Sequence, residues 1–334
     1  MATIKSSNIN ITDLDFEGVE RSLKEYLKGQ DILKDYDFEG SNLAILTDLL
    51  AYSAHTSAFN ANMVASEMFL DTAQIRKNVV SRAKELGYTP SSRTAAKATF
   101  DLTVNSPTIG GVTPNSLTLN RGHEFTTVFD GTSYTFIALD NKTITAVNGA
   151  FIFKDLDIYQ GRLTTDVYRY DHQVANQRFA LLNGAVDTST ITINVTSNNV
   201  VTAWTKAGDL TGITSKSEVF YIQENDEGLF EVYFGDGVIG ASPKDGDQIS
   251  ISYLVTDANH ANGANVFSMA TSINGNSDVT FTNTVSASGG KDIETTDQIK
   301  FSASKFYTSQ NRLVTVQDYK ASAKESWRTF SQNV

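Results

Sequence analysis

The stretch KATFDLTV, residues 97–104, decides the fold class, because the spacing of apolar residues changes there. Phe100, Leu102 and Val104 occupy every second position, which is the spacing of a half-buried β-strand. Upstream of this stretch the apolar residues have helical spacing, and downstream many short alternating runs follow. The sequence therefore predicts an α+β chain. An N-terminal arm of long helices in a bundle is followed by mainly antiparallel β domains, and then by the start of a further α/β C-terminal domain.

The longest predicted helix lies upstream and has Ser41 as its N-cap. Two adjacent stripes of residues run along it, which indicates a helix covered on more than one side, as in a bundle. About thirty residues correspond to ~45 Å, so part of this surface is expected to belong to another chain. One stripe consists of Ile45, Leu49, Tyr52, Thr56, Phe59, Met63, Ser66 and Leu70, and the other of Leu43, Leu46, Leu50, Ala54, Ala58, Ala61, Ala65 and Met68.

A shorter helix is predicted on each side of the long one. Residues 16–27 have helical apolar spacing. Thr72 is expected to cap the third helix at its N-terminus. Gly87 stands where a left-handed C-cap residue belongs, and Tyr88 follows as its apolar neighbour, so this helix is expected to end there.

Downstream of residue 97, short strands separated by turn residues predict antiparallel sheets rather than βαβ units. The stretch TTVFDGTSYTFIAL, residues 126–139, predicts a hairpin with a type I′ turn at Asp130-Gly131. The other predicted strands are residues 142–147, 150–158, 189–197, 217–224, 228–235 and 247–255.

Helical spacing returns near Asp292. Thr296 is expected to cap the helix that follows, and Thr315 and Asp318 have the spacing of a capping box. The sequence stops at Val334 without a closing signal, so a C-terminal domain is expected to continue beyond it. The predicted divisions are a helical arm at 1–94, a β-rich domain at 95–215, a second β region at 216–290, and a helical start of the next domain at 291–334.

Composition excludes several classes of function. The 334-residue chain has a net charge of −11, which disfavours binding to nucleic acid phosphates. It has no cysteine, which excludes disulfide frameworks and thiolate metal sites and fits a reducing compartment. Residues 49–66 carry no charge but contain several polar side chains, so they predict a helix buried in protein contacts rather than a membrane span. Neither a nucleic acid nor a membrane is an expected partner.

The stretch FGDGVIGASPKDGDQISISYLV, residues 234–255, has the glycines of a phosphate loop but not its context. It lies between two predicted strands and has no helix N-terminus to hold an anion. The spacing of a calcium loop is also absent. The sequence therefore favours structural turns at Gly235, Gly237, Gly240 and Gly246. A casual cation site formed by Asp236, Asp245 and Asp247 stays open as an alternative.

Other candidate sites have weak signals. The four histidines (His55, His123, His172 and His260) do not form a metal-ligand motif. Acidic residues that could form a glycosidase pair are Asp155, Asp157, Glu224, Asp226 and Glu227, although solvated turn residues explain them more simply. Trp204 could stack on a sugar, but a hydrophobic anchor in a β domain is favoured. The sequence predicts no catalytic residues, no metal and no cofactor.

Two parts of the chain carry a resemblance. They are residues 32–92, with DYDFEGS and LLAY, and residues 231–266, with FGDG and the later GANV, followed by NRLVTVQDY at 311–319. Together they resemble the baseplate J-like family, and within it the large inner baseplate wedge subunits of T-even-like contractile-tailed phages. His123 departs from the family, which tends to have a small hydroxyl residue at that position.

The resemblance implies a structural subunit of the virion, assembled in the host cytoplasm, without enzymatic activity. Such subunits join neighbouring wedges as dimers into a ring around the tail hub, and their helical part packs in a bundle with another wedge protein. The expected partner-binding residues here are Leu49, Tyr52, Phe59, Met63 and Leu70, and no small molecule is expected to bind. The main alternative is a carbohydrate- or receptor-binding β module of a phage tail, and a glycan-cleaving enzyme is a third hypothesis.

Overall fold

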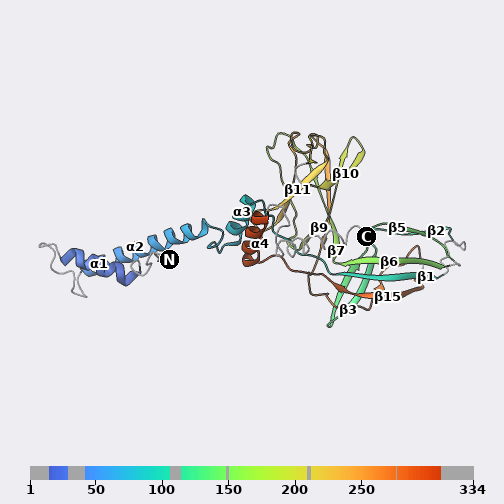
Figure 1. Cartoon of the computed structure of the whole chain (residues 1–334), viewed down its shortest axis with the longest axis horizontal. Helices are drawn as coiled ribbons and strands as arrows, with labels where there is room; N and C mark the ends of the chain where they lie inside the picture. Colours follow the sequence, from blue (N-terminus) through green and yellow to red (C-terminus); the bar gives the residue numbers. More distant parts are fainter. Residues whose placement is uncertain are drawn as a thin grey trace, which may run out of the picture. The chain divides into compact units, whose positions relative to one another are not determined.

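A computed structural model describes residues 15–28, 42–105, 114–147, 150–208, 212–275 and 277–309. The chain forms two compact units, residues 1–82 and 83–334. Figure 1 labels the elements in chain order, from α1 in blue to α4 in red. Helices come first and antiparallel sheets follow, so the predicted α+β class is confirmed.

The first unit contains α1 (Phe16–Lys28), α2 (Asn42–Glu67) and the start of α3 (Arg76–Glu85). Asp15 caps α1, because its Oδ1 accepts a hydrogen bond from the N–H of Gly18 at 2.6 Å. α1 packs against α2. The buried residues of α2 are small (Ala44, Thr47 and Ala51), so little of its large apolar surface is covered within the described part of the chain. No described helix is long and apolar enough to cross a membrane.

The start of α3 differs from the sequence prediction. Thr72 does not cap this helix, because its hydroxyl donates to the carbonyl of Ser66 at 2.6 Å and so closes the end of α2. Glu67 takes the capping role instead, and its carboxylate accepts hydrogen bonds from the N–H of Gln74 and from Nδ2 of Asn78. The prediction for Thr72 is therefore wrong, since an acidic side chain from the preceding helix reaches the free amides first.

The end of α3 is as predicted. Gly87 has φ +79°, and its N–H donates to the carbonyl of Lys84 at 2.9 Å. The N–H of Tyr88 donates to the carbonyl of Ala83 at 3.0 Å. These two bonds form a Schellman motif with glycine at the left-handed position.

The first sheet has six strands and belongs to the second unit. Asp130 and Gly131 both have positive φ between β3 and β4, which confirms the predicted hairpin turn. The N–H of Gly263 donates to the carbonyl of Ala287 at 2.7 Å, so the sheet curls until the segment before β14 reaches β15. The strands, in spatial order, are β14 (Ser268–Met269), β3 (Glu124–Phe129), β4 (Thr132–Ile137), β6 (Ala150–Gln160), β1 (Lys97–Asn105) and β15 (Val279–Ser288).

The curled sheet encloses an aromatic core. Phe100 lies 5.3 Å from Phe125 and 5.0 Å from Phe281, with edge-to-face rings. A two-stranded sheet of β2 (Ser116–Leu119) and β5 (Lys142–Thr145) adds buried leucines to the same core. The alternation quoted from residues 97–104 is thus the inward face of β1, which alternates between buried and half-buried residues along its length.

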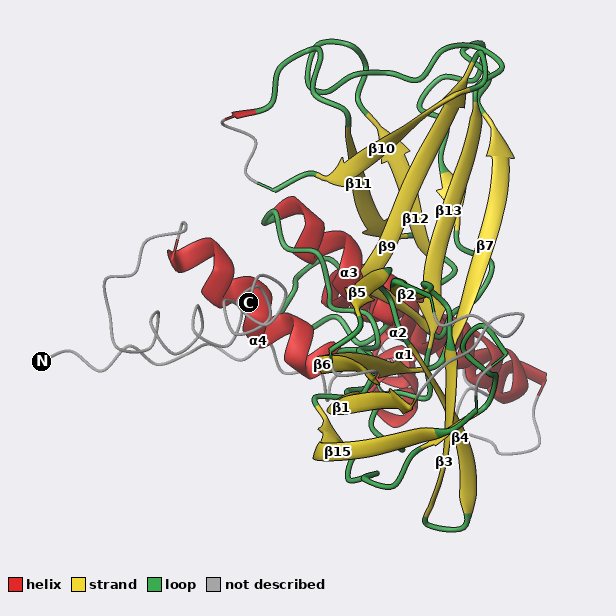
Figure 2. Cartoon of the chain, turned by 90° about the vertical axis from the view of Figure 1, so that its right-hand side faces the viewer, coloured by secondary structure: helices red, strands yellow, loops and turns green. Residues whose placement is uncertain are grey.

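The second sheet has seven strands, and Figure 2 shows β7, β13 and β9 side by side. β10 and β11 pair in parallel, an exception to the antiparallel arrangement. The strands come from both sides of residue 215, where the sequence suggests a boundary; that boundary stays a prediction. In spatial order the strands are β7 (Arg162–Arg169), β13 (Gln248–Val255), β9 (Val186–Ser197), β10 (Val200–Lys206), β11 (Val219–Glu224), β12 (Phe230–Phe234) and β8 (Phe179–Ala180).

The chain enters and leaves this sheet at one place, because Arg162 of β7 pairs with Val255 of β13. Gln160 clamps the two connecting segments together. Its Oε1 accepts hydrogen bonds from the hydroxyl of Thr256 at 2.6 Å and the N–H of Asp257 at 2.9 Å, and its Nε2 donates to the Asp257 carboxylate at 2.8 Å. The Gln160 side chain is buried. Residues 162–255 therefore form one continuous module on a short, hydrogen-bonded neck.

The last described helix is α4 (Thr296–Ser309). Its cap is Thr295, whose hydroxyl accepts from the N–H of Gln298 at 3.4 Å, while Gln298 Oε1 accepts from the N–H of Thr295 at 3.0 Å. The prediction of Thr296 as the cap is wrong by one residue, because two neighbouring threonines offer the same hydroxyl. The predicted capping box of Thr315 and Asp318 lies outside the described residues.

Candidate functional site

An exposed apolar surface lies on α2 and includes four of the five predicted partner-binding residues. Leu49 and Tyr52 are each 62% exposed, Phe59 60% and Met63 45%, whereas Leu70, beyond the helix end, is half-buried. Other exposed apolar residues on and just after this helix are Ile45, Leu46, Leu50, Val64, Met68 and Phe69.

This apolar surface is wide. At about 100° per residue, the exposed apolar side chains of α2 spread over about half of the helix circumference. The buried residues Ala44, Thr47 and Ala51 lie on the opposite side. A solvated helix normally keeps that half polar, so the surface has the character of a protein interface.

In the glycine-rich stretch, the first turn follows β12. A side chain at Gly235 would overlap the carbonyl oxygen of Ile239 and the backbone of Gly240. Gly237 and Gly240 have φ of +85° and +86°. The N–H of Gly237 donates to the carbonyl of Gly240 at 3.0 Å. Asp236 accepts hydrogen bonds from the backbone N–H groups of Ile239 and Val238, which lower the pKa of its carboxyl group below the ordinary value. The glycines of this turn are therefore needed for its backbone conformation and close backbone packing.

The second turn precedes β13. Gly246 has φ +80°, and its N–H donates to the carbonyl of Tyr170 at 2.9 Å. Asp247 accepts from the N–H of Lys244 at 2.8 Å. Each of these groups is bonded to the turn itself or to the end of β7, so this segment connects strands and leaves no cradle of free N–H groups.

The three aspartates proposed as a casual cation site do not form one cluster. Asp236 and Asp247 hold separate turns. Asp245 instead lies beside His172, with Oδ1 at 3.2 Å from Nδ1, and this hydrogen bond lowers the pKa of Asp245.

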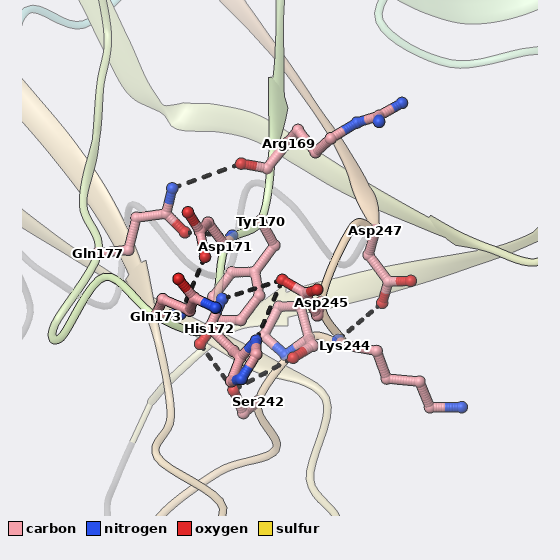
Figure 3. A network of polar contacts seen from close by, with 11 residues as sticks. Arg169, Tyr170, Asp171, His172, Gln173, Gln177, Ser242, Lys244, Asp245 and Asp247 are labelled. Carbon is pink, nitrogen blue, oxygen red and sulfur yellow. Dashed lines mark hydrogen bonds and ion pairs between the residues drawn. The ribbon is translucent and has the colours of Figure 1, made fainter.

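Asp171 joins His172 and Asp245, and one ligand atom from each lies within 4.8 Å of the others (Figure 3). This group could not be predicted from the sequence, because its members come from loops 73 residues apart. All three side chains are exposed. Asp171 also accepts from the N–H of Gln173, and Asp245 from the N–H of His172. Turn formation therefore accounts for the group.

The acidic residues considered for glycoside cleavage differ in their surroundings. Asp157 accepts from the hydroxyl of Thr99 at 2.6 Å and pairs with Lys97 at 2.7 Å. Asp155 has φ +47° at an irregular position of β6, where its N–H donates to Asp101. Glu224 is buried, whereas Asp226 and Glu227 are exposed on the turn after β11.

The aromatic residues of the seven-stranded sheet are used internally. Trp204 is 7% exposed and meets Phe234 edge-to-face at 4.9 Å, so the prediction of a hydrophobic anchor is confirmed. Tyr233 stacks on Tyr221 at 5.1 Å and carries Arg178 over its ring at 5.2 Å. These rings do not present the open faces on which sugars stack.

The four histidines lie on different parts of the chain. Burial lowers the pKa of His123, which packs against Phe125 at 5.3 Å. His55 is half-buried on α2, and His260 lies exposed in a turn. His172 lies beside Asp245.

Comparison with known proteins gives two family matches. Residues 15–88 match the helical domain of baseplate wedge protein gp6-like proteins. Residues 163–255 match the third domain of the bacteriophage baseplate wedge protein gp6. The first match covers α1 to α3, and the second coincides with the seven-stranded module.

Two individual proteins are similar as well. Baseplate wedge protein gp6 of Enterobacteria phage T4 is 29% identical over 347 residues, which cover 96% of this chain and 51% of the T4 protein. The chain thus spans about half the length of this relative. A cryo-EM structure of the anti-feeding prophage baseplate matches 90% of this chain and 62% of its own chain at 14% identity, with a TM-score of 0.34.

Proposed function

We propose that this chain is a structural, non-enzymatic subunit of a phage tail baseplate wedge and acts as a component of the virion. Support comes from the two family matches, both to domains of baseplate wedge proteins, and from the similarity to the T4 wedge protein along almost the whole chain. The wider kinship with the baseplate J-like family is part of the proposal and rests on the glycine-rich stretch at residues 234–255.

The helical arm, residues 12–88, is the proposed interface with another wedge protein. The observation that carries this is the half-circumference of exposed apolar side chains on α2. Burying one Leu, Phe or Met side chain contributes about 1.5–3 kcal/mol, so covering several of them would stabilise a complex strongly. An isolated helix pair of this length is only marginally stable in water, so a partner would also stabilise the arm.

In this proposal the subunits join neighbouring wedges, through dimers, into a ring around the tail hub. The β region would space and orient the arm, and the turns at Gly235, Gly237, Gly240 and Gly246 belong to that region. Rearrangement on sheath contraction would then move whole units, because their cores are closely packed.

The alternative of a carbohydrate-binding β module has less support. It rests on the Thr-, Asn- and aromatic-rich composition of the β region, but Trp204 is buried and Tyr233 is covered by Tyr221 and Arg178. It also leaves the apolar surface of α2 without a role.

The test is the mass of the chain by light scattering, alone and mixed with the neighbouring wedge proteins of the same genome. A stable hetero-complex that disappears when residues 12–88 are deleted is the expected result. A chain that stays monomeric and ignores those proteins would overturn the proposal, provided that circular dichroism shows folded β sheet in both forms.

A further inference from the structure

One edge of the seven-stranded sheet is a long and regular strand. β7 pairs with β13 over all its residues, from Arg162 opposite Val255 to Arg169 opposite Gln248, without a register shift. In the described part of the chain no strand pairs with its other side, and Figure 2 shows β7 at the right-hand limit of the sheet. The opposite edge is β8, which has only two residues. β7 is therefore long enough to accept a further strand.

Alternate residues of β7 direct their backbone groups away from β13. The N–H of Tyr170 donates to the carbonyl of Asp247 at 2.9 Å, which sets the phase of the ladder. This phase repeats every two residues in an antiparallel pair. The N–H and C=O groups of Leu163, Thr165 and Val167 consequently point outward.

Both ends of this edge are closed. The carbonyl of Arg169 accepts from Nε2 of Gln177 at 3.4 Å. At the other end the N–H of Gly161 donates to the carbonyl of Thr135 in β4 at 2.9 Å, and β4 contacts β7 without pairing with it. The open part is residues 163–167, here called the β7 edge. It offers three residues with outward backbone groups, and Val167 is 57% exposed.

The β7 edge is flanked by two unpaired positive charges. Arg162 and Arg169 are exposed, and neither forms an ion pair with any residue that the structure describes. In Figure 3 the guanidinium of Arg169 points away from the carboxylates of Asp171 and Asp245. The chain as a whole carries a net charge of −11, so two free arginines beside an open strand are a local exception.

These charges argue against pairing of two copies through this edge. An antiparallel pair of β7 strands needs outward residues opposite each other, for example Thr165 opposite Thr165, and Arg162 of one copy would then lie one residue from Arg169 of the other at both ends. Positive charges gathered in this way repel each other, which disfavours such a pair. An acidic partner would instead be attracted electrostatically to Arg162 and Arg169.

We propose that the β7 edge binds an extended segment of another protein, uncharged in its middle and acidic at both ends, which joins the sheet as a further strand. Backbone hydrogen bonds to Leu163, Thr165 and Val167 provide the attachment, and Arg162 and Arg169 select the acidic ends. This surface is separate from the helical arm, and the inference does not depend on the proposed function.

The experiment uses the whole chain and a synthetic peptide of alternating threonine and valine with an aspartate at each end. Amide hydrogen exchange is measured residue by residue, with and without the peptide. We expect exchange at residues 163, 165 and 167 to slow by about tenfold or more at saturation, because those N–H groups become bonded. The same peptide with lysine at each end is expected to bind at least about fivefold more weakly.

The matched variants are Val167→Pro and Val167→Thr. Proline removes an outward N–H that β13 does not use, so binding should be lost while the sheet stays folded, whereas threonine keeps the N–H and should keep binding. The double variant Arg162→Glu with Arg169→Glu should reverse the preference between the two peptides. Absence of protection at millimolar peptide, equal binding of both peptides, or a homodimer that Val167→Pro abolishes would each overturn the proposal.

Discussion

At the scale of single residues, Gly235 is required because the backbone of residues 239 and 240 lies too close to leave room for a side chain. Because an added Cβ would overlap the backbone of residues 239 and 240, we expect Gly235→Ala to lower the free energy of unfolding by about 2 kcal/mol. Gly208→Ala is the matched control, since nothing lies within 4 Å of its Cβ position, and a change within about 0.5 kcal/mol is expected. Urea unfolding of both variants measures the difference; equal stability would contradict this account of the turn.

A second residue-scale prediction concerns pH. Backbone N–H groups bonded to the carboxylate hold the pKa of Asp236 below its ordinary value. A group with a depressed folded pKa stabilises the protein above its unfolded pKa, and that stabilisation is lost as the pH falls through the folded pKa. Asp236 should therefore contribute fully above about pH 4, near the ordinary pKa of Asp, and lose its contribution at lower pH. Unfolding of Asp236→Asn should depend less on pH below 4 than that of the native chain.

A third residue-scale prediction concerns the buried carboxylate of Asp187. It accepts hydrogen bonds from the N–H of Ala95 at 2.7 Å and from the N–H and hydroxyl of Ser189 at 2.9 and 2.6 Å. An amide in its place would turn a donor toward a donor, so Asp187→Asn should lower the free energy of unfolding by about 1–3 kcal/mol. Asp226→Asn, at an exposed turn, is the control in the same urea experiment.

At the scale of the element, α2 exposes residues that a solvated helix would not. We expect Leu49→Asp combined with Phe59→Asp to weaken binding of a wedge partner by at least about 3 kcal/mol, because two buried side chains would be replaced by charges. The β sheets should keep their melting temperature, since these residues contact none of their cores. Light scattering of mixtures provides the measurement.

The control for that variant carries the same chemical change elsewhere. Val128 and Val200 are 73% and 65% exposed in the β region. Val128→Asp with Val200→Asp adds the same charge without touching α2. Assembly that fails equally in both double variants would show that added charge, not loss of the α2 surface, is responsible.

Elements whose signals are local could be predicted from the sequence. The turn at Asp130-Gly131 and the helix end at Gly87 each depend on a positive φ that a short motif specifies. The sequence does not predict β2, β7, β8, β10, β14 or β15. In β15 two register shifts against β1 break the alternation that would have marked it, and Asn283 has positive φ.

Sites that depend on distant contacts could not be predicted. Capping of α3 by Glu67, and the meeting of His172 with Asp245, require knowledge of where separate segments return in space. The apolar surface of α2 could be predicted, because a long apolar helix is recognised from its own sequence, and its binding to a partner stays a prediction.

At the scale of the whole molecule, residues 162–255 are expected to fold when expressed alone. Their sheet has its own buried core, and its first and last residues, Arg162 and Val255, are already paired. A fragment of residues 95–215 should fail to fold, because it lacks β13, which β9 and β7 need as a common neighbour. Circular dichroism and thermal unfolding of both fragments test this; cooperative unfolding of 95–215 would instead support a domain boundary at residue 215.

The neck of the module also sets how it responds to force. A force that pulls residues 160 and 257 apart acts on the paired ends of β7 and β13. It would separate the two strands one hydrogen-bonded pair at a time. Unzipping of this kind resists load far less than sliding whole strands past each other. The Gln160 clamp bridges that entrance with three hydrogen bonds, so tension along the chain meets the clamp before it meets the sheet. The hydrogen bonds of one buried glutamine would therefore have to break before a pulling force reached the seven-stranded module.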